Sequence, residues 1–189
     1  DPKVQKYNEF TVLFRGRLLP EAGGEYVVEA AKFLEDKGIK VLMLANGMLL
    51  SKIEDLIKKY KPKNLQLITE FLPDDTLGEM MRKCHLSLGQ LSDHERLKRT
   101  IPHKAYEAIA LHLPYLTARN LAVFELLRDG ETCLTCNPSD SEDLAEKIVW
   151  AKEHPQELEK IAENANNLYI HHLTSKILAQ NILDRIKWV

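Results

Sequence analysis

Six short apolar segments alternate along the chain with segments that carry apolar residues at helical spacing. None of the six shows the regular polar–apolar alternation of a strand in a hairpin sheet, so they suit a parallel sheet covered by helices on both faces. The sequence therefore predicts an α/β fold: a Rossmann-like, doubly wound parallel sheet of about six strands with a helical carboxyl-terminal tail. The predicted strands are residues 10–15, 39–44, 65–68, 86–88, 114–117 and 133–136, and the predicted helices are 26–37, 48–60, 74–84, 103–112, 121–128 and 139–189.

Length and charge restrict the class of protein. The 189 residues suffice for one domain with a substantial core. The chain carries 26 Lys and Arg against 28 Asp and Glu, and this balance argues against a nucleic-acid binder that neutralises phosphates. No apolar stretch is long enough to span a bilayer and no signal peptide is visible, so we expect a cytoplasmic location, with membrane association only in a full-length form. The first residue is Asp1 rather than Met, which suggests a processed product or an excised domain.

The three cysteines are too few for a disulfide framework and favour a reducing compartment. Cys133 and Cys136 form a single C-x-x-C motif, but no second ligand pair follows at the spacing that a zinc site requires. A redox motif would place its first cysteine at the start of a helix, whereas residues 132–136 have the pattern of a strand. We expect both residues to be buried or half-buried strand thiols.

In a doubly wound sheet, ligands bind beyond the carboxyl ends of the strands. The turn after the first strand has neither the G-x-G-x-x-G of dinucleotide-binding folds nor the phosphate loop of P-loop proteins. It does contain Gly16, which allows close backbone approach, with Arg17 beside it, and both features favour an anion. The residues expected at the next two strand ends are Asn46, Gly47 and Phe71.

A basic loop follows the fourth predicted strand. Residues 93–104 hold four basic and two acidic side chains, whereas residues 140–163 hold three basic and eight acidic ones. The acidic segment is typical of a solvated helix surface. The basic loop is different because it lies at the predicted carboxyl edge of the sheet. Its basic residues are Arg96, Lys98, Arg99 and Lys104.

The run that follows this loop resembles a family motif. Residues 101–116 read Ile-Pro-His-Lys-Ala-Tyr-Glu-Ala-Ile-Ala-Leu-His-Leu-Pro-Tyr-Leu. This is similar to the P-x-K-x-(Tyr/Phe)-E-A-x-A-x-x-x-P run of the glycosyltransferase group 1 family, retaining enzymes of the GT-B type with two Rossmann-like domains. Further matches follow the family order and include F-x-G-R at residues 14–17. Because the ordered set covers about residues 9–165, it is far more specific than any single motif.

The resemblance implies a function and a domain organisation. Residues 1–189 would form a single nucleotide-sugar-binding domain, the carboxyl-terminal half of an enzyme whose amino-terminal acceptor domain is absent. The enzyme would transfer a sugar from a nucleoside-diphosphate sugar to an acceptor hydroxyl in glycan, polysaccharide or glycolipid synthesis. No cofactor, metal or nucleic acid is implied. The catalytic residues, the acceptor site and any peripheral membrane contact are expected in the missing domain.

The resemblance also implies roles for individual residues. Glu107 matches the glutamate that accepts the ribose hydroxyls, and Arg17 matches the arginine that binds the diphosphate. Lys104 would add a second positive charge near the amino end of the same helix. The full set of expected nucleotide-sugar-binding residues is Gly16, Arg17, Asn46, Gly47, Phe71, Arg99, Lys104 and Glu107.

Two positions depart from the family pattern. Many relatives have a second glutamate eight positions before the ribose glutamate, where this chain has Arg99. They also have a lysine five positions after the first arginine, where this chain has Ala22. We hypothesise that the basic residues of the loop, together with Lys104, supply compensating charge.

Other functions stay open at this point. A nucleotide-sugar epimerase or a phosphorylase shares the two-domain plan, and the two departures suit a degenerate, non-catalytic nucleotide-binding module. His94 and His103 lie near the site without a carboxylate at a diagnostic spacing, so neither is expected to be a general base. The apolar residues Leu168, Ile177 and Ile182 are expected to pack in the core or between helices, with an acceptor groove as the alternative.

Overall fold

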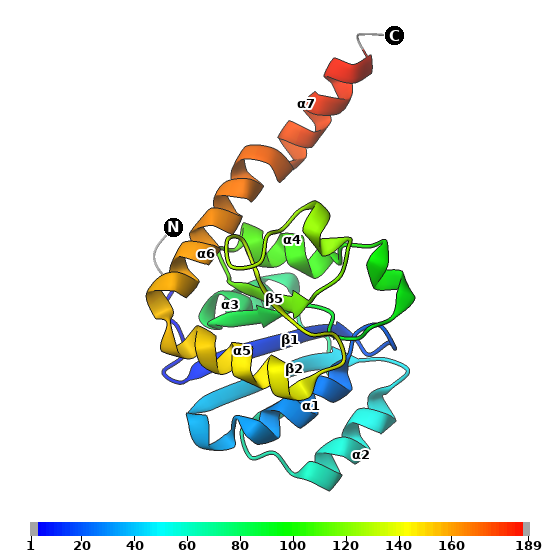
Figure 1. The fold of residues 1–189 in the computed structure, drawn as a ribbon, viewed down its shortest axis with the longest axis vertical. Coiled ribbons are helices and arrows are strands. Elements are labelled where there is room, and N and C mark those ends of the chain that lie inside the picture. Colours follow the sequence, from blue (N-terminus) through cyan, green and yellow to red (C-terminus); the bar gives the residue numbers. More distant parts are fainter. Residues whose placement is uncertain (1–3, 187–189) are drawn as a thin grey trace.

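The chain folds around one parallel sheet of six strands (Figure 1). The structure is a computed structural model and describes residues 4–186. The strands lie in the order β3-β2-β1-β4-β5-β6, and every neighbouring pair is parallel. This is the doubly wound arrangement predicted from the sequence. The strands are β1 Phe10–Arg17, β2 Ile39–Asn46, β3 Leu65–Ile68, β4 Leu86–Leu88, β5 Tyr115–Ala118 and β6 Leu134–Cys136.

Helical segments connect the strands and cover the sheet (Figure 1). The α-helices are α1 Gly24–Phe33, α2 Leu50–Tyr60, α3 Asp74–Lys83, α4 His103–Ala110, α5 Ser141–Glu153, α6 Pro155–Leu168 and α7 Ser175–Ile186. Shorter 3-10 turns are η1 Glu35–Lys37, η2 Glu95–Lys98 and η3 Val123–Glu125, and η4 Tyr169–Leu173 is a π-helical turn.

Side-chain alternation along β1 divides the core between the two faces of the sheet. Val12 and Phe14 point into the largest apolar cluster, which also contains residues of α1, α2 and α5. Leu13 points to the opposite face and packs with Met81 of α3. A third cluster joins α4 to β5 and α6. Both faces are therefore covered, as a parallel sheet of apolar strands requires.

The predicted elements differ from the observed ones mainly at their ends. β1 and β2 extend two residues further than predicted because they stay in register as far as Gly16 beside Ala45 and Arg17 beside Asn46. The helix predicted at residues 121–128 is only the short turn η3, because the chain turns again at residue 128, whose carbonyl accepts hydrogen bonds from the amides of Thr132 and Cys133. α4 ends at Ala110, two residues early, and a left-handed residue follows shortly after its end.

The carboxyl-terminal segment is helical as far as it is described; the predicted helical residues 187–189 lie outside the described residues. α7 extends away from the body of the domain (Figure 1). Its Ile182 side chain is 59% exposed, so the expected packing of this residue between helices is wrong within the structure described. No helix between residues 4 and 186 is long and apolar enough to cross a bilayer.

The three cysteines are buried free thiols. Burial raises the pKa of each thiol to about 12, which keeps the sulfur protonated and unreactive at neutral pH. Cys136 ends β6 and Cys133 directly precedes this strand. The interpretation of the C-x-x-C motif as a pair of buried thiols is confirmed.

Candidate functional site

The strand order reverses between β1 and β4, and ligands of doubly wound folds bind at such a switch point. β1 ends with Gly16 and Arg17, and Gly89 directly follows β4. Lys104, near the start of α4, reaches over this edge of the sheet. Its Nζ donates a hydrogen bond to the Gly89 carbonyl at 3.3 Å and lies 4.8 Å from the centre of the Phe14 ring. The structure thus places an ammonium group at the switch point.

Glycines lie at the ends of both strands beside this ammonium. Gly16 has a φ of 128°, and a Cβ there would lie 3.8 Å from Lys104 Nζ. At Gly89 a Cβ would overlap the Tyr115 hydroxyl and the Thr117 side chain. The backbone at Gly16 therefore stays open to the site, while Gly89 is required by the packing of β5 beneath it.

The surroundings of Lys104 favour the binding of an anion. Burial, and to a smaller extent the charge of Arg15, lowers the pKa of Lys104 to about 7. No carboxylate within residues 4–186 forms an ion pair with this ammonium. An anion bound beside it would favour the charged form and would gain a charge-assisted hydrogen bond.

Glu107, one turn further along α4, lies between two basic side chains. One carboxylate oxygen forms an ion pair with the Arg15 guanidinium, and the other lies 3.4 Å from His103 Nδ1. The Arg15 side chain is 16% exposed, and the Glu107 side chain is 34% exposed. Burial lowers the pKa of Arg15 from its usual value. Glu107 is therefore held from within the protein by Arg15 and stays open to solvent.

The two side chains that contact Glu107 are not expected from the sequence to do so. His103 does have a carboxylate partner, because residues four apart on a helix share one face, and Glu107 lies at that spacing. The expectation that His103 has no such partner is wrong. Arg15 is not among the site residues expected from the sequence, although it lies next to Gly16 and Arg17.

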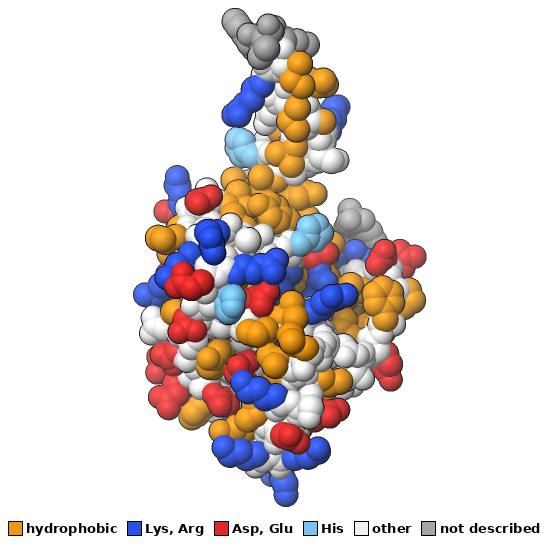
Figure 2. Space-filling model, turned by 90° about the vertical axis from the view of Figure 1, so that its right-hand side faces the viewer, with side chains coloured by type: hydrophobic (Ala, Val, Ile, Leu, Met, Phe, Trp, Pro, Cys, Tyr) orange, Lys and Arg blue, Asp and Glu red, His pale blue; other side chains and the backbone are white. Residues whose placement is uncertain are grey.

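A cleft of about 730 Å³ opens beside the switch point, at the carboxyl ends of β1, β2 and β3. Figure 2 shows this side of the molecule, where Lys and Arg side chains gather next to exposed hydrophobic ones. Phe71 is 92% exposed at the cleft and offers a bare aromatic face. The predicted site residues that line the cleft are Gly16, Arg17, Asn46, Gly47 and Phe71, and Arg15 lines it as well.

Asn46 fixes the wall of the cleft. Its amide donates a hydrogen bond to the Thr69 carbonyl at 3.0 Å and accepts one from the Gly47 amide at 2.7 Å. Gly47 has a φ of 146°, and a Cβ there would lie 2.8 Å from the Leu18 backbone nitrogen. The Asn46 side chain thus joins the ends of β2 and β3, and the close approach of the β2 end to Leu18 requires glycine at position 47.

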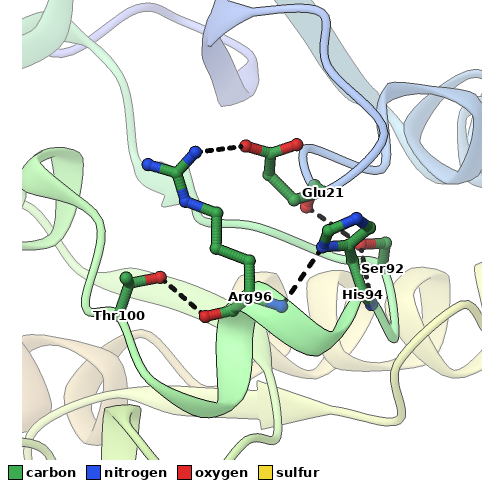
Figure 3. A network of polar contacts seen from close by, with 5 residues as sticks. All are labelled: Glu21, Ser92, His94, Arg96 and Thr100. Carbon is green, nitrogen blue, oxygen red and sulfur yellow. Dashed lines mark hydrogen bonds and ion pairs between the residues drawn. The ribbon is translucent and has the colours of Figure 1, made fainter.

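The basic loop contributes less free charge than expected. Arg96 forms an ion pair with the buried Glu21 at 3.2 Å, and Lys98 pairs with Glu95 at 2.5 Å. Figure 3 shows Arg96 within a polar network that joins this loop to the turn after β1. The hypothesis that the whole loop supplies compensating charge is therefore corrected for these two residues, because each already has a carboxylate partner.

The structure also shows where the two departures from the family pattern lie. Ala22 is 3% exposed within the largest core cluster, so this position contributes packing in place of a cation. Arg99 directly follows η2, and its exposed side chain does not line the cleft. Lys104 and Glu107 lie beside the cleft and are joined to it through Gly16 and Arg15.

The part of the chain that the structure describes contains no group of three or more His, Cys, Asp or Glu side chains arranged to hold a metal ion. What the site does present is cationic groups, one open carboxylate and an exposed aromatic ring. These groups suit a ligand that carries anionic, hydroxyl and flat apolar parts together.

A doubly wound sheet with a cleft beside its switch point defines a Rossmann-like class of domain. Within that class, residues 1–168 match the family of group 1 glycosyl transferases. The chain belongs to this family.

Individual relatives agree with this assignment. The chain is 28% identical over 160 residues to the alpha-D-kanosaminyltransferase of Streptomyces kanamyceticus, a match that covers 82% of this chain and 39% of the relative. It is 26% identical over 151 residues to the 2-deoxystreptamine N-acetyl-D-glucosaminyltransferase of Niallia circulans, covering 77% of this chain and 36% of the relative. The chain thus spans less than half the length of these curated relatives.

Solved structures share the fold. HepE of Anabaena, in complex with UDP and glucose, superposes with a TM-score of 0.81 at 19% identity, over 96% of this chain and 49% of that one. The C-terminal domain of LpcC, a group 1 family protein of Francisella tularensis, superposes with a TM-score of 0.74 at 17% identity, over 88% of this chain and 87% of that one. Both likenesses concern the fold, which is the predicted α/β arrangement.

Proposed function

We propose that this chain is the donor-binding half of a retaining glycosyltransferase, and that it binds the nucleoside diphosphate of a nucleotide sugar at the switch point. The observation that carries the proposal is the Lys104 ammonium between the ends of β1 and β4, without a carboxylate partner among the described residues. A half-buried cation of this kind is costly unless an anion compensates it. A diphosphate is an anion of suitable charge and size.

The remaining groups divide between the parts of such a ligand. Arg17, exposed at the end of β1, and Lys104 would contact the diphosphate and stabilise the charge that develops on it as leaving group. Glu107 would accept the ribose hydroxyls with the part of its carboxylate that faces solvent. The base would lie along Asn46 and Gly47, with Phe71 as a stacking surface.

The sugar acceptor is proposed to bind to a second, amino-terminal domain. The chain spans 39% and 36% of two named transferases, and each of these has room for another domain of similar size. We place the complete protein in the cytoplasm because three free thiols suit a reducing compartment. Any contact with a membrane would be made through the amino-terminal half.

Substituting Glu107→Gln should weaken nucleoside diphosphate binding by about 10- to 100-fold, since a neutral amide replaces charge-assisted hydrogen bonds to the ribose. The dissociation constants of UDP, GDP and ADP can be measured by isothermal titration calorimetry, and at least one of the three should bind the unmodified chain.

Glu131→Gln is the matched control for this substitution. Glu131 also pairs with an arginine, Arg128 at 3.4 Å, but it is exposed and does not line the cleft. The control should bind the nucleotide as the unmodified chain does. Absence of binding by all three nucleotides, or equal losses in the two variants, would contradict the proposed function.

A further inference from the structure

Arg15 is the side chain that joins the cleft to α4. It lines the cleft together with Gly16 and Arg17, and its guanidinium also forms the ion pair with Glu107. Arg15 is far less exposed than Arg17, although the two side chains alternate to the same face of β1. Its Nε is buried without a hydrogen-bond partner within residues 4–186, and the ion pair that its guanidinium forms there is the one with Glu107. The charged group of Arg15 is therefore paired with Glu107.

Glu107 has another cation within reach on its own helix. Lys104 lies three residues earlier on α4, and side chains at this spacing are neighbours on a helix surface. In the structure the two do not pair, because Glu107 turns to Arg15 and Lys104 turns over the sheet edge to the Gly89 carbonyl. Glu107 and Lys104 thus stay apart, each with its own partner.

This separation keeps two binding functions apart. A carboxylate accepts up to about four hydrogen bonds, so Glu107 can accept from ribose hydroxyls while Arg15 holds it. An ammonium neutralised by Glu107 would attract a diphosphate less strongly. Each group is available to its own part of the ligand only while Arg15 occupies the carboxylate.

We propose that Arg15 is a positioning residue that holds Glu107 toward the ribose and away from Lys104, and that it thereby sets the preference of the site for ribonucleotides. The inference rests on the proposed function, because it assigns a task to a residue of the same site. Arg15 acts through Glu107, so its removal should lower the contribution of the ribose hydroxyls to affinity more than the contribution of the rest of the nucleotide.

The test compares a ribonucleotide with an analogue that lacks the hydroxyls. The probes are the tightest binder among UDP, GDP and ADP, and the 2′,3′-dideoxy form of the same nucleotide. Their dissociation constants are measured by calorimetry for the unmodified chain, Arg15→Met and Arg15→Lys. Arg128→Met is the control, because Arg128 also pairs with a glutamate but lies outside the cleft.

The unmodified chain and Arg128→Met should prefer the ribonucleotide by about 10-fold or more, the value of one charged hydrogen bond. Arg15→Met should lose most of this preference through weaker ribonucleotide binding, with the dideoxy affinity changed by about threefold or less. Arg15→Lys keeps the charge without the planar fork and should recover part of the preference for the ribonucleotide. If the methionine variant does not fold, the lysine variant carries the test.

The outcomes separate this inference from the proposed function. If the unmodified chain binds no ribonucleotide, the proposed function fails. If the unmodified chain prefers the ribonucleotide and both Arg15 variants keep that preference, or if they lose affinity for both probes equally, the positioning role of Arg15 is wrong while the proposed function stands.

Discussion

Replacing Gly89 by alanine should lower the free energy of unfolding by about 3 kcal/mol, the upper part of the range for overpacking a close-packed site. The new Cβ would overlap Thr117 and the Tyr115 hydroxyl, and both residues belong to β5 within the core. Thr117 is anchored by its hydrogen bond to the Gln90 carbonyl at 2.9 Å, so it cannot move aside without losing that bond. Urea denaturation monitored by circular dichroism measures the loss.

Gly130→Ala is the comparison that separates crowding from backbone strain. Gly130 has a φ of 74°, and a Cβ there would meet nothing within 4 Å. Its substitution should cost only the strain of a left-handed alanine, about 1 kcal/mol. Equal losses at the two glycines, or no loss at Gly89, would show that β5 does not pack against this residue as described.

Replacing Lys104 by methionine should weaken nucleoside diphosphate binding by about 10- to 100-fold, because the site loses a charge-assisted hydrogen bond to the diphosphate. The corresponding nucleoside, which has no phosphate, should bind within about threefold of its original affinity. Competition calorimetry with both ligands gives the two ratios. An equal effect on nucleoside and diphosphate would mean that Lys104 acts through the fold rather than on the phosphates.

The same substitution should change how stability depends on pH. In the folded chain the pKa of Lys104 is lowered to about 7 from its usual 10.5, chiefly by burial. Between these values the unfolded chain binds more protons, so the contribution of Lys104 to stability rises with pH from about 7 upward. Water at the cleft screens part of the effect, and we expect a gain on the order of 1 kcal/mol between pH 7 and pH 9.

Urea unfolding of the unmodified chain and Lys104→Met at these two pH values isolates the contribution of the lysine. Methionine keeps most of the apolar stem and carries no proton, so the variant should be the more stable of the two at pH 7, and its advantage should shrink by pH 9. An advantage that grows with pH would contradict a depressed pKa at Lys104.

The sequence predicted the sheet and the local parts of the site. Short apolar runs indicated the parallel strands, and the motif around Pro102 and Glu107 placed Lys104 near the amino end of a helix. These features depend on neighbours within a few residues. The His103–Glu107 contact belongs with them, because the four-residue spacing was present in the sequence.

The rest of the site depends on contacts between distant segments. The Arg15–Glu107 pair joins residues 92 positions apart, and the Arg96–Glu21 pair joins residues 75 positions apart. Strand alternation indicates which residues share a face, but it does not say which helix covers that face. For the same reason the apolar stripe through Ile182 predicted a helix correctly without showing that its side chain is exposed.

The most direct test of the account is to locate a bound nucleoside diphosphate by NMR. In a titration with the tightest binder of UDP, GDP and ADP, amide shifts should change at Gly16, at Gly89 and at the amino end of α4. A separate groove of about 490 Å³ between α1 and α5, lined by Phe33 and Trp150, offers the competing location. Shift changes confined to that groove, with Gly16 and Gly89 unaffected, would contradict nucleotide binding at the switch point.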